Sequence, residues 1–245
     1  MINYIESGSS FENIISAHGN HDVFLTKIIV LYRAYGISKY ADFWYQHIFG
    51  RVTAIICRVG NDFLLSCTNF TDFEELKEFL NVLGFTSVLC DEKIPINPVC
   101  SRCKTGFVMQ LKNKTVCNIQ NVTTDRNYKE LYSFLKKINS SSIPLPGYAD
   151  FVTDLFAKVR NNIAEIHTIK SNEKIIAACI SVTDGINTVI SPLATSEEYR
   201  GKGLAKALVY SLQGNVCLLC NDGINRIIYE KMGFAVIGNW KEIYR

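Results

Sequence analysis

The sequence lacks an excess of charge of one sign, a long apolar run and a secretory leader. Its 26 basic and 23 acidic side chains give a formal net charge of +3. Without a basic stripe, this balance predicts no binding to nucleic acid. No apolar segment approaches the roughly 20 residues that cross a bilayer. The first residues do not combine a basic segment with an apolar one. We therefore expect a cytoplasmic protein without a membrane partner.

The sequence also lacks a complete set of zinc ligands, although it contains nine cysteines. Structural zinc sites need four converging ligands. The pair Cys100 and Cys103 has no second pair to complete it. The pair Cys217 and Cys220 lies in a strand-like run, in which positions i and i+3 point to opposite faces. We predict no metal site and interpret the cysteines of apolar runs as reduced core residues rather than a disulfide framework.

The composition indicates a globular protein with a substantial core. A hydrophobic content of 48% and a charged content of 20% in 245 residues fit one large or two small domains. Two parts of the chain share a predicted order of two helices, three strands, a helix and a strand. Helical spacing is strongest over residues 23–35 and 73–83 in the first part and over residues 128–138 in the second. We predict an α/β fold with domains at residues 1–118 and 119–245.

The stretch of residues 199–205 places two glycines and two cations between a predicted strand and a predicted helix. Gly201 and Gly203 allow positive φ and a close approach of the backbone to a ligand. The first N–H groups of a helix lack intrahelical partners. Together with the helix dipole and the charges of Arg200 and Lys202, they predict a site for an anion, typically phosphate. The spacing matches neither a P-loop nor the dinucleotide fingerprint. On this stretch alone, a glycine-rich helix start with solvated charges is an equal alternative.

The motif Arg200-x-x-Gly203-x-Ala205 resembles the (Arg/Gln)-x-x-Gly-x-(Gly/Ala) signature of the GNAT superfamily of acyltransferases. Downstream, residues 229–234 read Tyr-Glu-Lys-Met-Gly-Phe and resemble the end of the last helix of GNAT domains. Two signatures in this order are more specific than one, and residues 120–245 are identified as a member of the family. The resemblance implies the GNAT fold, a mixed and mostly antiparallel sheet flanked by helices. The first half is then either a smaller, degenerate repeat of that fold or an unrelated α/β cap.

The resemblance implies direct transfer of an acetyl group from acetyl-coenzyme A to a primary amine, carried by a small molecule or a peptide. In the family, the amides of this turn hold the pyrophosphate, and the preceding strand contacts the pantetheine arm through its main chain. Pro192 has no N–H, so these strand contacts fall on later residues. Family members often have proline where this chain has Glu197, which leaves the turn less rigid. The implied cofactor contacts are Leu193, Thr195, Arg200, Gly201, Lys202, Gly203, Leu204, Ala205 and Asn225.

Three side chains are candidates for the catalytic proton transfers. Tyr229 matches the family's tyrosine near the thioester sulfur and is the candidate general acid; alternatively, its hydroxyl only bonds to the backbone. Glu165 and His167 share one face of a predicted strand by alternation, and either is a candidate base. Alternatively, both lie on a solvated face. Of three polar residues around the start of the last helix, we expect Asn225 to contact the cofactor.

The first half differs at the position that matches the phosphate turn. Residues 68–72 contain no glycine and no basic side chain, and Asp72 adds an acid. We expect this turn to repel a pyrophosphate, which leaves the first half to pack against the second, to wall the acceptor site or to form a homodimer. For the whole chain, a non-catalytic acyl-coenzyme A sensor or scaffold and a protein that binds another nucleotide stay open as alternatives.

Overall fold

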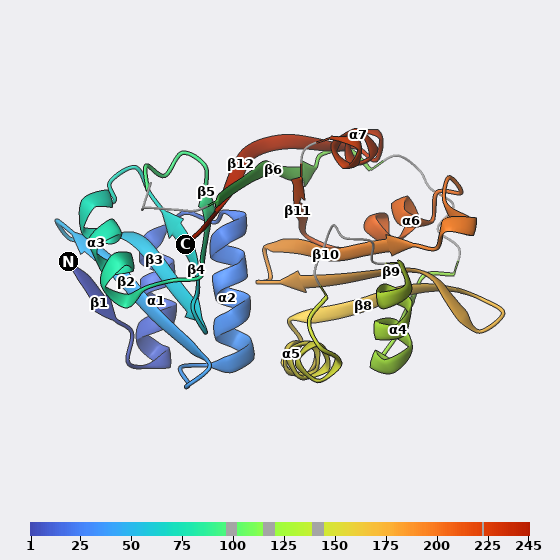
Figure 1. Ribbon diagram of the computed structural model, residues 1–245, viewed down its shortest axis with the longest axis horizontal. Helices are drawn as coiled ribbons and strands as arrows, with labels where there is room; N and C mark the ends of the chain where they lie inside the picture. The colour runs from blue at the N-terminus through green and yellow to red at the C-terminus, as the bar shows by residue number, and fades with distance from the viewer. Residues whose placement is uncertain (97–101, 115–120, 139–144, 222) are drawn as a thin grey trace. The chain divides into compact units, whose positions relative to one another are not determined.

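The computed structural model describes residues 1–96, 102–114, 121–138, 145–221 and 223–245 (Figure 1). These residues form two compact units. The first unit contains Met1–Met109, Leu219–Ile228 and Val236–Arg245, and the second contains Gln110–Leu218 and Tyr229–Ala235. The first unit therefore contains both ends of the described chain, and each unit is built from segments that are not continuous in sequence. The predicted domain boundary, between residues 118 and 119, lies outside the described residues.

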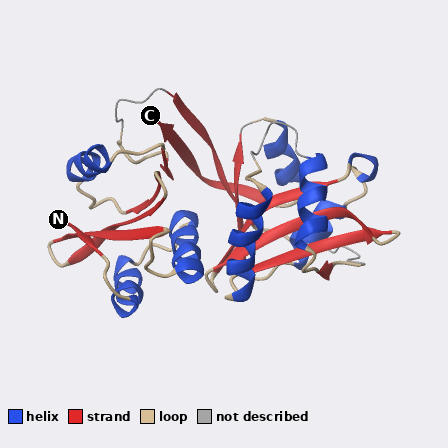
Figure 2. Ribbon diagram, turned by 60° about the horizontal axis from the view of Figure 1, so that its bottom comes forward, coloured by secondary structure: helices blue, strands red, loops and turns tan. Residues whose placement is uncertain are grey.

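The first unit is built on a sheet with the strand order β1-β2-β3-β4-β5-β12-β6. The neighbours β2, β3 and β4 are antiparallel, whereas β4 and β5 run parallel. Helices flank the strands (Figure 2). The elements are β1 (Ile2–Tyr4), α1 (Gly8–His18), α2 (Val23–Tyr35), β2 (Ala41–Ile48), β3 (Arg51–Val59), β4 (Asp62–Cys67), α3 (Phe73–Leu83), β5 (Ser87–Asp91), β6 (Arg102–Leu111) and β12 (Phe234–Tyr244).

Carboxylate caps and glycines set the helix ends of the first unit. Asp22 accepts a hydrogen bond from the N–H of Leu25 at 2.7 Å, at the start of α2. Asp72 accepts from two backbone N–H groups in the first turn of α3, both at 3.1 Å. Gly36 and Gly84 follow the two helices with positive φ. As a result, α2 and α3 have the bounds that the sequence predicts.

The strand β12 completes the sheet of the first unit, which the sequence analysis did not foresee. Its residues pair antiparallel with β5, in a register that sets Trp240 against Asp91. The indole of Trp240 donates to the carbonyl of Cys220 at 3.1 Å. A Cβ at Gly106 of β6 would collide with both groups, so this position requires glycine. The unit's core includes Ile243 of β12 beside Leu76, Leu80 and Val88.

The second unit has the strand order β11-β10-β9-β8-β7. All neighbours are antiparallel except β10 and β11, which run parallel. This mixed, mostly antiparallel sheet confirms the predicted fold class. The elements are β7 (Thr123–Thr124), α4 (Tyr128–Ile138), α5 (Tyr148–Arg160), β8 (Ala164–Ser171), β9 (Lys174–Thr183), β10 (Asn187–Thr195), α6 (Leu204–Ser211) and most of β11 (Asn215–Asn221). The end of β11 and the first residues of α7 (Ile224–Lys231) belong to the first unit, and α7 enters the second unit at Tyr229.

The helices α4 and α5 cover one face of the second unit's sheet. Leu131 and Leu155 pack there with Ile166, Ala178 and Ile180 in one buried cluster. Because side chains alternate along a strand, the residues between these strand positions point to the opposite face. That opposite face carries the predicted catalytic pair of β8 and lies on the side of α6.

The described residues also bear on the metal site, the membrane span and the cysteines that the sequence analysis considered. No group of three or more His, Cys, Asp or Glu side chains among them could hold a metal ion. No helix among them is long and apolar enough to cross a membrane. The cysteines of the strand-like runs are free, and burial raises the pKa of the Cys217 thiol to about 11. Cys100, half of one Cys-x-x-Cys pair, lies outside the described residues.

Candidate active site

The predicted phosphate turn joins β10 to α6 through a short 3-10 helix, Glu197–Tyr199. Gly201 has φ 76° and Gly203 has φ 79°, in the left-handed region that favours glycine. A Cβ at either position would meet nothing within 4 Å. The glycines are therefore required by backbone conformation and leave the space above the turn open. Gly203 is the N-cap of α6 and supplies no side-chain hydrogen bond, so no side-chain cap occupies the first amides of the helix.

Positive charge surrounds the turn. Arg200 and Lys202 are exposed, and neither forms a salt bridge with a carboxylate among the described residues. The Nε of Arg200 donates to the carbonyl of Thr195 at 3.4 Å, and the Nζ of Lys202 lies 4.7 Å from the ring centre of Tyr199. Lys206, in the first turn of α6, is a third cation at this end that the sequence analysis did not name. Leu204 and Ala205 are half-buried beneath the turn.

The strand before the turn has main-chain groups that β9 does not use. The N–H of Ser196 donates to the carbonyl of Ile176 at 2.8 Å, on the side of β9. Backbone N–H groups alternate sides along a strand, so those of Leu193 and Thr195 point away from β9. On that other side, β11 pairs with β10 only over Asn187–Val189. The hydroxyl oxygen of Thr195 is buried and has no hydrogen-bond partner among the described residues.

The candidate acid, Tyr229, lies on α7 at the point where the helix returns to the second unit. Its ring packs edge-on against Phe234, with 5.7 Å between ring centres. The hydroxyl of Tyr210, on α6, donates to the carbonyl of Met232 at 3.0 Å and fixes this end of α7. Asn225 is exposed and belongs to the first unit, so its contact with the cofactor stays a prediction.

The apolar spacing of α7 does not create a buried face. Ile224, Ile227 and Ile228 follow the i, i+3, i+4 pattern of a helix that packs against a core. Their side chains are nevertheless exposed, Ile224 by 78%. Helical periodicity is thus correct for this segment, whereas the burial that such periodicity normally indicates is absent.

The two candidate bases lie on one face of β8, as alternation predicts. The Nε2 of His167 is 3.1 Å from a carboxylate oxygen of Glu165 and 3.5 Å from the Oγ of Ser181 on β9. Glu165 is largely exposed, but His167 is only 6% exposed, which corrects the alternative of a solvated face for this residue. Burial lowers the pKa of His167, and the nearby charge of Glu165 opposes that shift. Burial thus favours the neutral imidazole, while the carboxylate of Glu165 stabilises the imidazolium that forms if the ring takes a proton.

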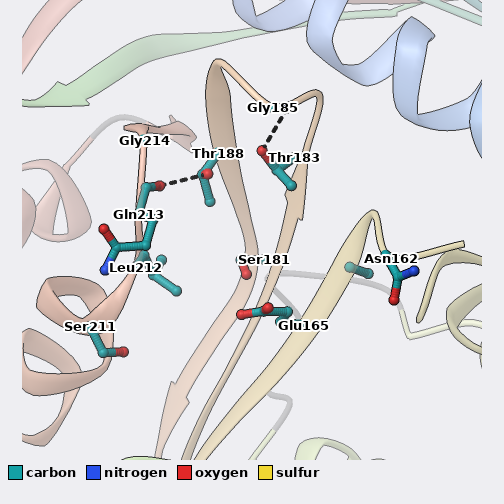
Figure 3. A pocket seen from close by; sticks show the side chains of 11 residues that line it. Asn162, Glu165, Ser181, Thr183, Gly185, Thr188, Ser211, Leu212, Gln213 and Gly214 are labelled. Atoms are coloured by element: carbon teal, nitrogen blue, oxygen red, sulfur yellow. Dashed lines mark hydrogen bonds between the residues drawn. The ribbon is translucent and has the colours of Figure 1, made fainter. Parts of the chain in front are cut away.

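A pocket of about 170 Å³ opens beside Glu165 (Figure 3). It lies entirely within the second unit, at the end of α6 opposite the turn. Ser181 and other polar residues of this pocket carry no sequence motif and were missed, although alternation along β9 could have placed Ser181 on this face. The lining residues are Asn162, Ala164, Glu165, Ser181, Thr183, Gly185, Thr188, Ser211, Leu212, Gln213 and Gly214.

Comparison with protein families gives one match. Residues 162–236 match the model of the acetyltransferase (GNAT) domain, a range that contains the turn, Tyr229 and the pair on β8. No curated protein matches the sequence.

Comparison with solved structures gives many GNAT proteins. A tandem GNAT protein from the clavulanic acid biosynthesis pathway matches with a TM-score of 0.59 and 10% identity, over 100% of this chain and 98% of its own. A Drosophila protein matches with a TM-score of 0.69 and 8% identity, over 100% and 98%. A GNAT-family acetyltransferase from Colwellia psychrerythraea matches with a TM-score of 0.55 and 12% identity, over 100% and 99%. At these identities the likeness shows the fold alone, and it extends over both halves of the chain.

Proposed function

Because residues 162–236 form an acetyltransferase (GNAT) domain, we propose that the protein transfers an acetyl group from acetyl-coenzyme A to a primary amine. The observation that carries this proposal is the turn before α6. Its left-handed glycines, its uncapped helix amides and its two cations, which form no salt bridge with any described residue, make a site suited to an anion. The hydroxyl oxygen of Thr195, on the adjacent strand, is buried and has no partner in the part of the chain that the structure describes, which fits a ligand that follows the strand from the turn.

In this proposal each element has one task. The amides from Gly201 to Ala205 hold the pyrophosphate, and the outward main-chain groups of Leu193 and Thr195 hold the arm as an added strand would. When bound, the cofactor supplies the thioester whose acyl carbon is attacked. The N–H groups of the strand are the available donors for charge that develops on the carbonyl oxygen.

Proton transfer is assigned to three side chains. An amine attacks only as the free base, and Glu165 with His167 can take the proton it loses. The lowered pKa of His167, which burial causes, and the exposure of Glu165 suit this task. Tyr229 is the proposed donor to the departing thiolate. The protons of the reaction balance, because the amine nitrogen loses one proton and the thiolate sulfur gains one.

The cofactor assignment is tested by ligand-dependent thermal stabilisation and by titration calorimetry. Acetyl-coenzyme A should raise the melting temperature of the protein, whereas ATP and NAD should not. The double variant Arg200→Ala/Gly203→Val should lose most of its affinity for acetyl-coenzyme A because it removes a cation and the left-handed cap together. Unchanged affinity in that variant, or stabilisation by ATP or NAD alone, would reject the proposal.

A non-catalytic acyl-coenzyme A-binding protein is the second candidate. The burial of His167 favours it, because a base at 6% exposure has little access to a bound amine. Release of free thiol from acetyl-coenzyme A, measured with a panel of amines, separates the two candidates. For an enzyme, Tyr229→Phe should lower kcat and leave cofactor affinity intact. A sensor should release no thiol with any amine in either form of the protein.

A further inference from the structure

We propose that the pocket beside Glu165 binds the acceptor, and that the acceptor is a small primary amine that carries several hydroxyl groups. The inference rests on the proposed acetyl transfer and adds the class of substrate. It depends on three properties of the pocket, which are its position relative to the turn, its single charge and the hydrogen-bonding state of its hydroxyl groups.

The pocket lies where an arm anchored at the turn would end. The strand β10 leads into the turn and α6 returns from it, so Thr188 at the start of the strand meets Ser211 at the end of the helix. An arm that follows β10 from Thr195 towards Leu193 therefore runs towards the pocket. Strand register sets Glu165 opposite Ser181, and Ser181 opposite Ile190. The register shifts between Ile190 and Leu193, whose partners Ser181 and Cys179 are two residues apart on β9, so this row lies about 7 Å before Leu193.

The charge of the pocket suits an ammonium group. Glu165 is the single charged residue among the described residues that line it. The pocket also meets the C-terminal end of α6, where the helix dipole is negative. An acceptor with a carboxylate or phosphate would find no cation in this lining, whereas a protonated amine finds a carboxylate. The same carboxylate, paired with His167, can then remove the proton before attack.

The hydroxyl groups of the pocket are available as acceptors. Each has a single proton, and three have already donated it to a backbone carbonyl. Thr183 donates to Asn187 at 2.9 Å and already accepts from the N–H of Gly185 at 3.0 Å, which leaves it one lone pair. Ser211 donates to Leu208 at 2.8 Å. Thr188 donates to Gln213 at 2.7 Å (Figure 3). What these oxygens still offer is lone pairs, so they are best matched by a ligand rich in O–H or N–H donors.

The size of the pocket favours a small molecule over a peptide. Its volume of about 170 Å³ is below the range of roughly 300–1,000 Å³ that holds drug-sized ligands. It corresponds to about six water molecules at roughly 30 Å³ each in the liquid. A short polyhydroxylated amine replaces such waters group for group.

The test compares two six-carbon amines, glucamine with five hydroxyl groups and hexylamine with none, with tetra-alanine as a peptide amine. Thiol release is measured at equal concentrations of free base. The expected result is a kcat/KM for glucamine about tenfold above that of hexylamine, as expected for one or two extra hydrogen bonds. Glu165→Gln should raise KM for both six-carbon amines, while the affinity for acetyl-coenzyme A stays unchanged.

A matched pair of serine variants tests the acceptor oxygens. Ser211→Ala should raise KM for glucamine by about 3–10-fold and leave hexylamine unaffected. The control is Ser133→Ala, because Ser133 lies on α4 away from the pocket and also donates to a carbonyl of its own helix, at 2.9 Å. A general loss of stability would affect both variants and both amines alike.

The outcomes separate this inference from the proposed function. Thiol release with a preference for hexylamine or tetra-alanine, or with a glucamine KM that Ser211→Ala does not change, overturns the inference and leaves acetyl transfer intact. If acetyl-coenzyme A neither binds nor turns over, the proposed function fails. Binding of glucamine to the pocket is then tested by a titration that NMR monitors. Shifts of the Ser181 and Gln213 backbone amide signals support the proposed pocket, and the absence of such shifts rejects it.

Discussion

The segment from β4 to α3 and the segment from β10 to α6 have the same layout and opposite chemistry at the turn. In both, a strand leads through a turn into a helix, and the strand after the helix pairs with the first in parallel. Both parallel ladders are short. Residues Asp62–Leu64 pair with β5, and Asn187–Val189 pair with β11. The first half therefore keeps the backbone arrangement that, in the second half, leaves the end of the strand unpaired on one side.

The difference lies in what satisfies the first amides of the helix. In the first half, Asp72 places its own carboxylate on the N–H groups of α3. In the second half, Gly203 offers no side chain, and the amides of α6 stay available for an external anion. One carboxylate thus supplies internally what a phosphate would supply from outside. This contrast supports the prediction that the first half has lost cofactor binding.

The largest expected effect comes from giving the second turn the cap of the first. Gly203→Asp places a carboxylate where the pyrophosphate is proposed to lie, and should lower the affinity for acetyl-coenzyme A by about 100-fold, roughly 2.7 kcal/mol. Calorimetric titration measures it. Gly60→Asp is the matched control, since Gly60 also has positive φ, 61°, in a hairpin of the first unit. Equal losses in both variants would show that backbone strain, not competition for the amides, is the cause.

A smaller effect is expected from reversing the charge at the second turn. Lys202→Glu should lower the affinity for acetyl-coenzyme A by about tenfold at low salt, and added salt should shrink the difference, because exposed charges are screened. Lys93→Glu, an exposed change in the first unit, should leave the affinity unchanged. A loss that does not vary with salt would contradict a role as a simple cation.

The pH dependence of stability should distinguish the buried histidines of the two units. Burial lowers the pKa of His18, whose Nε2 lies 3.1 Å from the Oγ of Ser66. In the unfolded state this histidine has a pKa of about 6.5, so below that pH the unfolded state binds a proton that the folded state does not bind. The free energy of unfolding therefore falls as pH falls, by at most about 1.4 kcal/mol per pH unit. Between pH 7 and 5, the free energy of unfolding of His18→Gln, measured by urea denaturation, should depend less on pH than that of the original protein. Burial raises the pKa of Asp22, beside Ser66, so this carboxyl changes the pH dependence of stability with the opposite sign. Its contribution is the same in the original protein and in His18→Gln.

An unchanged slope in His18→Gln would assign the pH dependence elsewhere. The corresponding substitution in the second unit, His167→Gln, should remove a separate share of the slope, because burial also lowers the pKa of His167. Two additive losses are expected for two independent histidines. A loss in only one variant would identify the unit that controls acid sensitivity.

The smallest expected effect is the loss of the first cap. Asp72→Ala removes the acceptor for two amides of α3 and should cost about 1 kcal/mol of unfolding free energy, measured by urea denaturation. The affinity for acetyl-coenzyme A should not change. A gain of affinity would mean that the carboxylate alone blocks a second cofactor site, and the contrast between the two turns would then reduce to one residue.

Local signals allowed accurate prediction where the physics is local. Caps and terminal glycines gave α2 and α3 their bounds, and alternation placed Glu165 and His167 on one face. The burial of His167 was not predictable, because it depends on α6, which covers that face from a distant part of the chain. The pocket residue Ser181 carries no motif. Periodicity also misled at Ile224, since a helix pattern states which side chains align and not whether a partner covers them.

The destination of β12 has a consequence for synthesis. A ribosome releases the chain from its amino terminus, and domains commonly fold as they emerge. Here, β5 pairs with β12, a strand that is translated after nearly the whole of the second unit. Until then its edge stays open to unwanted pairing with other nascent chains. The first half of this protein can therefore begin to fold early, but its sheet is completed only after most of the second unit has been translated.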